Sequence, residues 1–329
     1  MTPVGSGALR PSLGLILPAS TQGELPPDLG STSGSTEGSA ADVARLCRWA
    51  EAAGADSLWA VDHLFWPHPI AEPVTTLAVA AATTTRPVLG TCVLQLPLRQ
   101  PAQVAKQATA LQLLSGGRFV LGLGVGSHPG EYERAAVDFH RRGALMDEGL
   151  ARLRAAWSDD SAPASDYRQE PGAPPIPVWF GGSSPAARRR AAVGGDGWVP
   201  LFVTPDEYEA GLTALRRDAE GAGRDPDDVE PGVVVFAHVG EDGDAEGRGA
   251  AWLSDLYRVP AKAFQRHLVA GSAPECAAAL WSYAEAGARH VIVMVAGTGA
   301  VGQFQALRTG FDAEAERRPG GVLAGAALA

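Results

Sequence analysis

The stretch SLWAVDHLFWPHP, Ser57 to Pro69, joins an apolar run of strand type to a carboxylate and an imidazole. Leu58 to Val61 show no alternation of polar and apolar residues, which is typical of a strand buried on both faces of a parallel sheet. Asp62 and His63 follow directly. Burying such groups costs free energy unless they are paired or face a polar site. The end of this strand is therefore either a functional site or a capped, packed turn.

Seven other apolar runs have the same character, and helical patterns separate them, with proline near the start and glycine past the end. Together with the first run, the predicted strands are Leu13–Pro18, Ser57–His63, Pro87–Gln95, Phe119–Gly126, Ile176–Gly182, Gly197–Phe202, Gly232–Gly240 and His290–Gly297. The predicted helices are Ala41–Ala53, Pro73–Thr84, Pro101–Leu114, Arg141–Trp157, Pro185–Val193, Pro205–Ala222, Ala245–Leu268 with a break expected at Pro260, and Pro274–Ala286.

This alternation predicts an α/β fold, a (β/α)8 TIM barrel with loop insertions. An open doubly wound sheet is the competing architecture, but eight regular units in 329 residues favour the barrel. We predict one barrel domain over residues 1–315 and a disordered tail over 316–329. Residues 19–39, rich in Ser, Gly, Thr and Pro, form either a mobile lid over the barrel mouth or a flexible insertion without function.

The composition excludes several classes of protein. A formal net charge of −10 without a basic cluster argues against nucleic acid as a partner. Cys47, Cys92 and Cys276 are far apart in the sequence, so neither a metal site nor a disulfide framework is expected. Leu13–Leu17 is too short for a signal peptide or a membrane span, which predicts a soluble cytoplasmic protein with no membrane partner.

The catalytic residues of such a barrel lie at the carboxyl ends of its strands. Asp62 and His63 occupy this position on the second strand, which favours an acid/base pair or cofactor contacts over a helix cap and a packed histidine. Thr91, Cys92 and Val93 occupy it on the third strand. These residues either pack in the barrel interior or form a backbone bulge that supports a flat ligand. A packing role is the simpler interpretation.

The fourth strand ends in glycines at alternate positions, Gly122, Gly124 and Gly126. They resemble a dinucleotide fingerprint, but no helix opens directly on the last glycine, so this motif is weak. We expect instead that they thin one wall of the barrel, so that a large ring can lie against it. His128 is either a site residue or a loop residue.

The fifth strand runs into a turn of small residues before a helix, Gly181, Gly182, Ser183 and Ser184. Free backbone N–H groups, two hydroxyls and a helix N-terminus predict a phosphate site, to which Arg188 and Arg189 could add charge. The alternative is a simple turn with Ser184 as the N-cap.

Trp198, in the sixth predicted strand, is assigned to the substrate pocket, although a core position is commoner for tryptophan. The remaining histidines carry no motif and are expected to be structural or to lie at the surface: His68, His140, His238, His267 and His290.

Five segments carry a resemblance to a known family. They are DSLWAVDHL (56–64), PVTTLAVAAATTTRPVLGTCVLQLPLRQPAQVAKQATALQLLSGGRFVLGLGVG (73–126), VDFHRRGALMDEGLARLRAAW (137–157), IPVWFGGSSPAARRRAAVGGDGWVP (176–200) and GSAPECAAALWSYAEAGARHVIVMVAG (271–297). Together they resemble the luciferase-like monooxygenase superfamily, and within it the branch of F420-dependent oxidoreductases. The resemblance covers the chain from Leu13 to about Phe311.

The resemblance implies hydride transfer at a coenzyme F420 or FMN ring bound at the carboxyl mouth of the barrel. At the matching positions, Asp62 and His63 would lie close to the ring and the substrate, and Trp66 would contact one of the two. Cys92 and Val93 would hold a non-prolyl cis peptide behind the ring. Cofactor contacts are expected from Thr91, Cys92, Val93, Gly124, Gly126, Gly181, Gly182, Ser183 and Ser184.

We therefore predict an F420-dependent oxidoreductase that transfers a hydride between the deazaflavin and a small organic substrate. Because imidazole titrates near neutral pH, His63 is expected to donate the proton, with Asp62 orienting it or contacting the ring. Trp66, His128 and Trp198 are expected in the substrate pocket, and no metal is expected. Members of the family often form dimers, so a homodimer is expected.

Two other functions are compatible with the sequence. An FMN-dependent luciferase-like monooxygenase using molecular oxygen would need the same phosphate site. A non-catalytic cofactor-binding barrel would keep Gly181–Ser184 without needing Asp62 and His63. A hydrolase or aldolase is not supported, because both lysines, Lys106 and Lys262, lie in predicted helices and no serine nucleophile motif is present.

Overall fold

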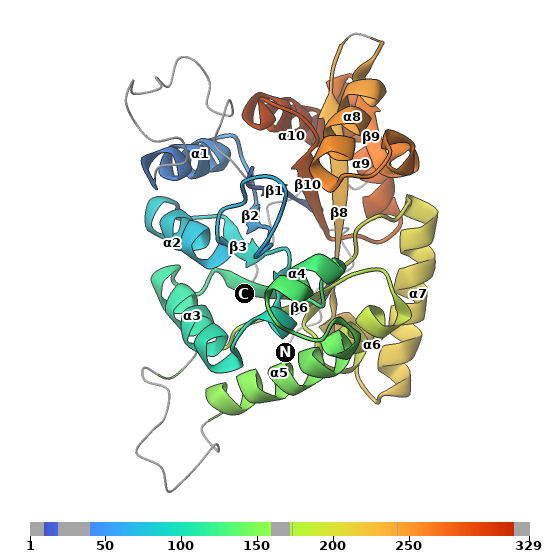
Figure 1. The fold of residues 1–329 in the computed structure, drawn as a ribbon. Coiled ribbons are helices and arrows are strands. Elements are labelled where there is room, and N and C mark those ends of the chain that lie inside the picture. Colours follow the sequence, from blue (N-terminus) through green and yellow to red (C-terminus); the bar gives the residue numbers. More distant parts are fainter. Residues whose placement is uncertain (1–9, 19–39, 159–171, 173, 242, 319–329) are drawn as a thin grey trace, which may run out of the picture.

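The parallel strands form a closed ring in the computed structural model, which describes residues 10–18, 40–158, 172, 174–241 and 243–318. Within these residues, eight strands follow one another around the ring in the order β1, β2, β3, β5, β6, β7, β8 and β10. Strand β10 pairs in parallel with both β8 and β1 and so closes the ring. The structure thus confirms the (β/α)8 barrel, built as a single domain (Figure 1).

Two short strands supplement the ring. β4 continues the line of β3 after Cys92 and Val93 and pairs with β5, whereas β9 pairs with the carboxyl half of β8. The strand bounds are β1 Ser12–Ile16, β2 Ser57–Ala60, β3 Val88–Thr91, β4 Leu94–Gln95, β5 Phe119–Gly124, β6 Val178–Gly181, β7 Gly197–Val199, β8 Glu230–Val239, β9 Leu268–Gly271 and β10 His290–Val295.

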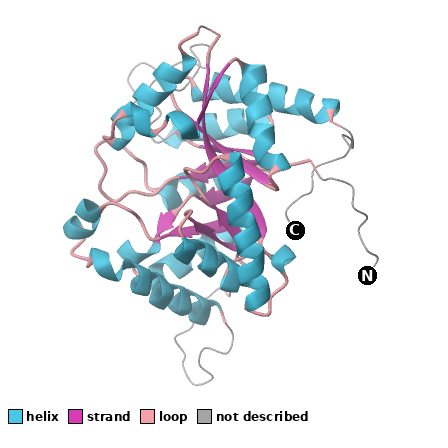
Figure 2. Cartoon of the chain, turned by 90° about the vertical axis from the view of Figure 1, so that its right-hand side faces the viewer, coloured by secondary structure: helices cyan, strands magenta, loops and turns pink. Residues whose placement is uncertain are grey.

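The helices surround the strands, as both ribbon views show (Figures 1 and 2). Proline stands within the first two positions of α2, α3, α4, α6, α7 and α9, where a missing N–H costs no hydrogen bond. The helix bounds are α1 Ala40–Ala52, α2 Pro73–Thr83, α3 Pro101–Leu114, α4 Pro129–Arg134, α5 Arg142–Trp157, α6 Pro185–Gly194, α7 Pro205–Gly221, α8 Ala245–Tyr257, α9 Ala273–Glu285 and α10 Ala300–Arg317.

The structure differs from the predicted elements mainly after β8. The expected helix 245–268 ends at Tyr257, because Arg258 adopts the left-handed conformation and Pro260 follows; its last residue instead begins β9. Helix α10, Ala300–Arg317, is not among the predicted elements, and the predicted domain bounds stay a prediction. The predicted loop 19–39 and residues 319–329 lie outside the described residues.

The core has two parts, one inside the ring and one between the ring and the helices. Trp59 and Trp179 fill part of the interior, with ring centroids 5.4 Å apart. Gly90, on the strand next to Trp59, lies so close that a Cβ there would overlap the indole ring. The absence of a side chain at this position therefore makes room for the tryptophan.

Replacing Gly90 with Ala should destabilise the protein by about 1–3 kcal/mol, because the added methyl group overpacks the barrel interior. Gly221→Ala is the matched control, since a Cβ there meets no atom within 4 Å. Urea unfolding followed by tryptophan fluorescence measures both variants. Equal stability of Gly90→Ala and the unmodified protein would contradict this packing.

Candidate active site

Two distant segments bring a histidine and a glutamate together at the carboxyl end of the ring. His63 follows β2, and Glu131 lies on α4, which follows β5. The Nδ1 atom of His63 lies 2.8 Å from Oε2 of Glu131. The Glu131 side chain is 2% exposed, whereas that of His63 is 21% exposed. His63 is thus the accessible member of the pair.

The pairing decides which nitrogen of His63 is available to a ligand. An ionised carboxylate only accepts hydrogen bonds, so Nδ1 of His63 is assigned the proton that it donates to Glu131, and Nε2 is left for the ligand. Burial by itself raises the pKa of Glu131. The hydrogen bonds from His63, Phe65 N–H and Gln95 outweigh burial and hold the pKa of Glu131 below its usual value. Glu131 is therefore an anion at neutral pH.

Asp62 is committed to other partners. Arg99 donates from its NH2 group to Asp62 Oδ1 at 2.6 Å and from Nε to Oδ2 at 3.1 Å. The Gln95 backbone N–H donates to Oδ2 at 2.8 Å. The expectation that Asp62 orients His63 is therefore corrected: Glu131 holds the imidazole, and both oxygens of the buried Asp62 are occupied by the ion pair and the backbone.

A cavity of about 670 Å³ opens in front of His63. Trp66 stacks on the His63 ring with centroids 3.9 Å apart, and His128 meets the Trp66 ring edge-on at 4.5 Å. Burial, and secondly the charge of His63, lowers the pKa of His128. The predicted residues Trp66 and His128 both line this cavity, together with residues that sequence reasoning did not single out, among them Phe65, Ile70, Glu131, Arg134 and Tyr257.

The third strand makes a bulge that turns Val93 toward the neighbouring strands, and the Cys92–Val93 peptide is cis. A Cβ on Gly124 would overlap Val93, and one on Gly181 would lie 2.6 Å from it. Part of the space beside Gly124 is thus taken by Val93, and Gly124 also lines the second cavity described below, so its part in cofactor binding stays a prediction. Burial raises the pKa of the Cys92 thiol to about 12, so it stays protonated.

The hydroxyl of Thr91 serves the barrel wall: it donates to the Gly122 carbonyl at 2.7 Å and is fully buried. Gly126 adopts a φ of 69°, and a Cβ there would overlap the Gln95 side chain. Neither residue lines the two cavities described here. Their part in cofactor binding stays a prediction.

A second cavity, of about 290 Å³, lies at the end of β6 and the start of α6. Gly181 and Ser184 line it, and the Ser184 hydroxyl also caps α6 by accepting the Ala187 N–H at 3.2 Å. Arg142 and Arg190 also line this cavity, but Arg190 is paired with Asp147 through Nε–Oδ1 at 2.6 Å and Nη2–Oδ2 at 3.0 Å. Arg188 binds Asp218 instead, which corrects the expectation that it adds charge at the turn.

Trp198 lies in the core and does not line either cavity, which corrects its predicted place in the substrate pocket. Its ring stacks on Tyr208 of α7 with centroids 5.6 Å apart, and its indole N–H donates to the Gly182 carbonyl at 3.0 Å. The strand alternation that points Trp198 toward α7 points its neighbour Val199 into the barrel interior.

Sequence reasoning missed Glu131, Gln95, Arg99 and the cations Arg142 and Arg190. Glu131 had a weak signal, because it stands in the glycine-rich stretch after the fourth strand, close to His128. Gln95 and Arg99 carry no local pattern, because their partner Asp62 lies 33 and 37 residues away in the sequence.

Within the described residues, no group of three or more His, Cys, Asp or Glu side chains is placed to hold a metal ion. No helix there is both long enough and apolar enough to cross a membrane. The expected homodimer and cytoplasmic location stay predictions.

Comparison with known proteins identifies the family. A family model described as luciferase-like monooxygenase matches residues 22–302, so the chain belongs to the luciferase-like monooxygenase family. The family resemblance seen in the sequence is thereby confirmed.

Among curated proteins, the chain is 33% identical over 226 residues to a phthiodiolone/phenolphthiodiolone dimycocerosates ketoreductase of Mycobacterium kansasii. The match covers 58% of this chain and spans 61% of the length of that relative.

Two solved structures share the fold. One is an F420-dependent secondary alcohol dehydrogenase in complex with an F420–acetone adduct, with a TM-score of 0.74, 17% identity, and coverage of 92% of this chain and 98% of that one. The other is the oxygenating constituent of 3,6-diketocamphane monooxygenase of Pseudomonas putida in complex with FMN, with a TM-score of 0.64, 17% identity, and coverage of 91% and 96%.

Replacing Arg99 with Met should destabilise the protein by about 3–5 kcal/mol, because the buried Asp62 carboxylate loses its counter-ion. The double variant Arg99→Met/Asp62→Asn should recover a large part of this loss, since no unpaired charge remains. Urea unfolding of both variants measures the effect.

The matched control is Arg141→Met, which removes a pair with Glu148 whose side chains are 57% and 51% exposed. That variant should lose no more than about 1 kcal/mol. A loss in Arg99→Met no larger than in the control would contradict the structural role of the buried pair.

Proposed function

We propose that the protein is an F420-dependent oxidoreductase that interconverts a ketone and a secondary alcohol. The observation that carries this proposal is the His63–Glu131 pair, which leaves Nε2 of an accessible imidazole at a cavity in the barrel mouth. The names of the mycobacterial ketoreductase and of the F420-dependent secondary alcohol dehydrogenase point to the same reaction class.

His63 moves the proton of this reaction. In the reducing direction its imidazolium donates the Nε2 proton to the carbonyl oxygen, and the neutral ring keeps its Nδ1–H on Glu131. In the oxidising direction neutral Nε2 accepts the hydroxyl proton. In both directions the anionic Glu131 stabilises the imidazolium and fixes the ring.

The bound deazaflavin would supply the hydride to the carbonyl carbon or accept it from the alcohol carbon. The residues present suit a phosphate-bearing cofactor, because the second cavity combines the start of α6 with the guanidinium of Arg142. Ser184 and Arg142 would bind the phosphate there, whereas Arg190 is already paired with Asp147. Ser183 and Gly182 would contribute backbone N–H groups from the same turn.

An FMN-dependent monooxygenase is the second candidate. The description of the family model and the FMN complex of the diketocamphane monooxygenase favour it. The phosphate site suits either cofactor.

Titration of the purified protein with F420 and, separately, with FMN distinguishes the two candidates. We expect F420 to bind saturably and at least about tenfold more tightly than FMN. Changes in ligand fluorescence measure the binding of each cofactor. Arg142→Gln should weaken F420 binding, because it removes the cation proposed to bind the phosphate. Tighter binding of FMN, or oxygen consumption with reduced FMN, would replace the first proposal by the second.

His63→Ala should lower kcat by about 100-fold or more with little change in the dissociation constant of F420, because it removes the proton donor and not a phosphate contact. Glu131→Gln should lower kcat less, since the amide still holds the ring but no longer stabilises its cation. Turnover of a secondary alcohol panel, followed by F420 absorbance, measures both. Unchanged turnover of His63→Ala would remove His63 from the mechanism.

A further inference from the structure

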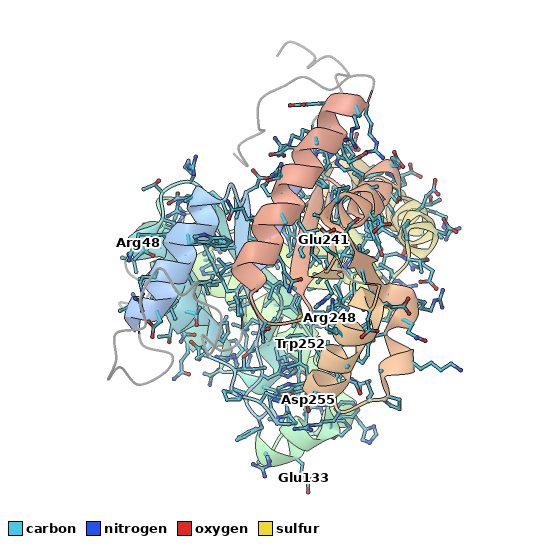
Figure 3. The ribbon with its side chains drawn as sticks, turned by 90° about the horizontal axis from the view of Figure 1, so that it is seen from above. Arg48, Glu133, Glu241, Arg248, Trp252 and Asp255 are labelled. Atoms are coloured by element: carbon cyan, nitrogen blue, oxygen red, sulfur yellow. The ribbon has the colours of Figure 1, made fainter. Side chains whose placement is uncertain are left out.

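Glu131, Arg134 and Arg258 are the charged residues that line the cavity in front of His63. The carboxylate of Glu131 is hydrogen-bonded to His63. Arg258, at the far wall, forms an ion pair with Asp255 at 3.0 Å. His68 lies 2.9 Å from the backbone carbonyl of Asp255 and 3.5 Å from its carboxylate. Both side chains therefore already have a partner on α8, on which Figure 3 labels Asp255.

Arg134 differs from the other cations of this cavity. Its guanidinium lies over the Phe65 ring, 5.6 Å from the centroid, and no carboxylate partner is found for it within the described residues. The adjacent Glu133 does not compensate it in the cavity, since Figure 3 shows Glu133 projecting outward from α4. A guanidinium that packs on an aromatic face can still donate hydrogen bonds to an anion, because its N–H groups point outward in the guanidinium plane.

Arg134 also stands in a fixed relation to the acid/base pair. It is three residues after Glu131 on α4, and residues at this spacing lie on the same face of a helix. Both line the same cavity. Apolar side chains, including Phe65 and Pro129, line this cavity too. A ligand whose reacting oxygen meets His63 can therefore reach Arg134 with another group.

We propose, building on the proposed function, that the substrate is an anionic hydrophobic molecule: an apolar body that carries the ketone or alcohol and a carboxylate, sulfonate or phosphate. Arg134 binds the anionic group, and the apolar lining binds the body. The His63 end of the cavity holds the reacting oxygen. Arg134 thus selects charged substrates over their neutral counterparts.

Two fluorescent probes that differ only in one anionic group test this assignment without turnover or cofactor. 8-Anilinonaphthalene-1-sulfonate carries a sulfonate, and N-phenyl-1-naphthylamine has the same rings without it. The native protein should bind the sulfonated probe about fivefold tighter than the neutral one, as expected of one exposed charge contact. Arg134→Gln should bring the ratio of the two dissociation constants close to one.

Two further variants keep the test specific. Arg134→Lys retains the cation and should preserve most of the preference. Arg217→Gln removes an exposed arginine of α7 that lines neither cavity and should leave the ratio unchanged. A ratio near one in the native protein, or an undiminished ratio in Arg134→Gln, would overturn the assignment.

The two proposals fail separately. Loss of F420 binding in the cofactor titration with an intact probe ratio would remove the proposed reaction and keep Arg134 as an anion site. Alcohol turnover with a probe ratio of one would keep the reaction and remove the anionic substrate.

Discussion

A guanidinium between two carboxylates organises the mouth of this barrel. Arg99 binds Asp62 at the end of β2 and Glu72, which caps the start of α2. Asp62 in turn receives the backbone N–H of Gln95 in β4. Because the Asp62 side chain is 1% exposed, neither partner can exchange this contact for water at low cost. The ion pair between Asp62 and Arg99 thus fixes the start of the loop that carries His63.

The same contacts extend to the acid/base pair. The Gln95 side-chain amide donates to the Asp62 carbonyl at 2.9 Å and also approaches the Glu131 carboxylate. Glu131 then holds His63. The polar groups of three strand ends therefore form one connected network, in which His63 is more exposed to the cavity than Glu131. Such an arrangement limits the rotation of the imidazole and favours a single tautomer.

The sequence predicted the ring of strands, because uninterrupted apolar runs such as Leu58–Val61 are typical of parallel strands and eight of them alternate with helical patterns. It also located His63, since a histidine at the end of such a strand lies at the barrel mouth. It could not assign the partner of His63. Asp62 is adjacent in sequence, but successive strand residues point to opposite sides, whereas Glu131 comes from another strand end.

Other errors have equally local causes. Helix α4 has six residues, which is too short for an apolar period to be seen. The sequence of α10 does have apolar residues at helical spacing, and Val301, Phe304, Leu307 and Phe311 are all buried. This helix follows the last strand and was not among the predicted helices. The glycines beside Val93 illustrate a further limit, because a close approach between strands is a property of the folded barrel and leaves no trace in composition.

The segment from α8 to β9 forms a small module beside β8. It begins after β8 and ends in β9, which pairs with Phe236–Val239 of the same strand. Closure of the ring does not involve it, because β10 pairs with β8 over Gly232–Ala237 independently. Yet Tyr257 and Arg258, at the end of α8, form one wall of the cavity in front of His63. Evolution can therefore exchange or lengthen this module and reshape the binding site, while the inherited scaffold and its proton-transfer machinery stay unchanged.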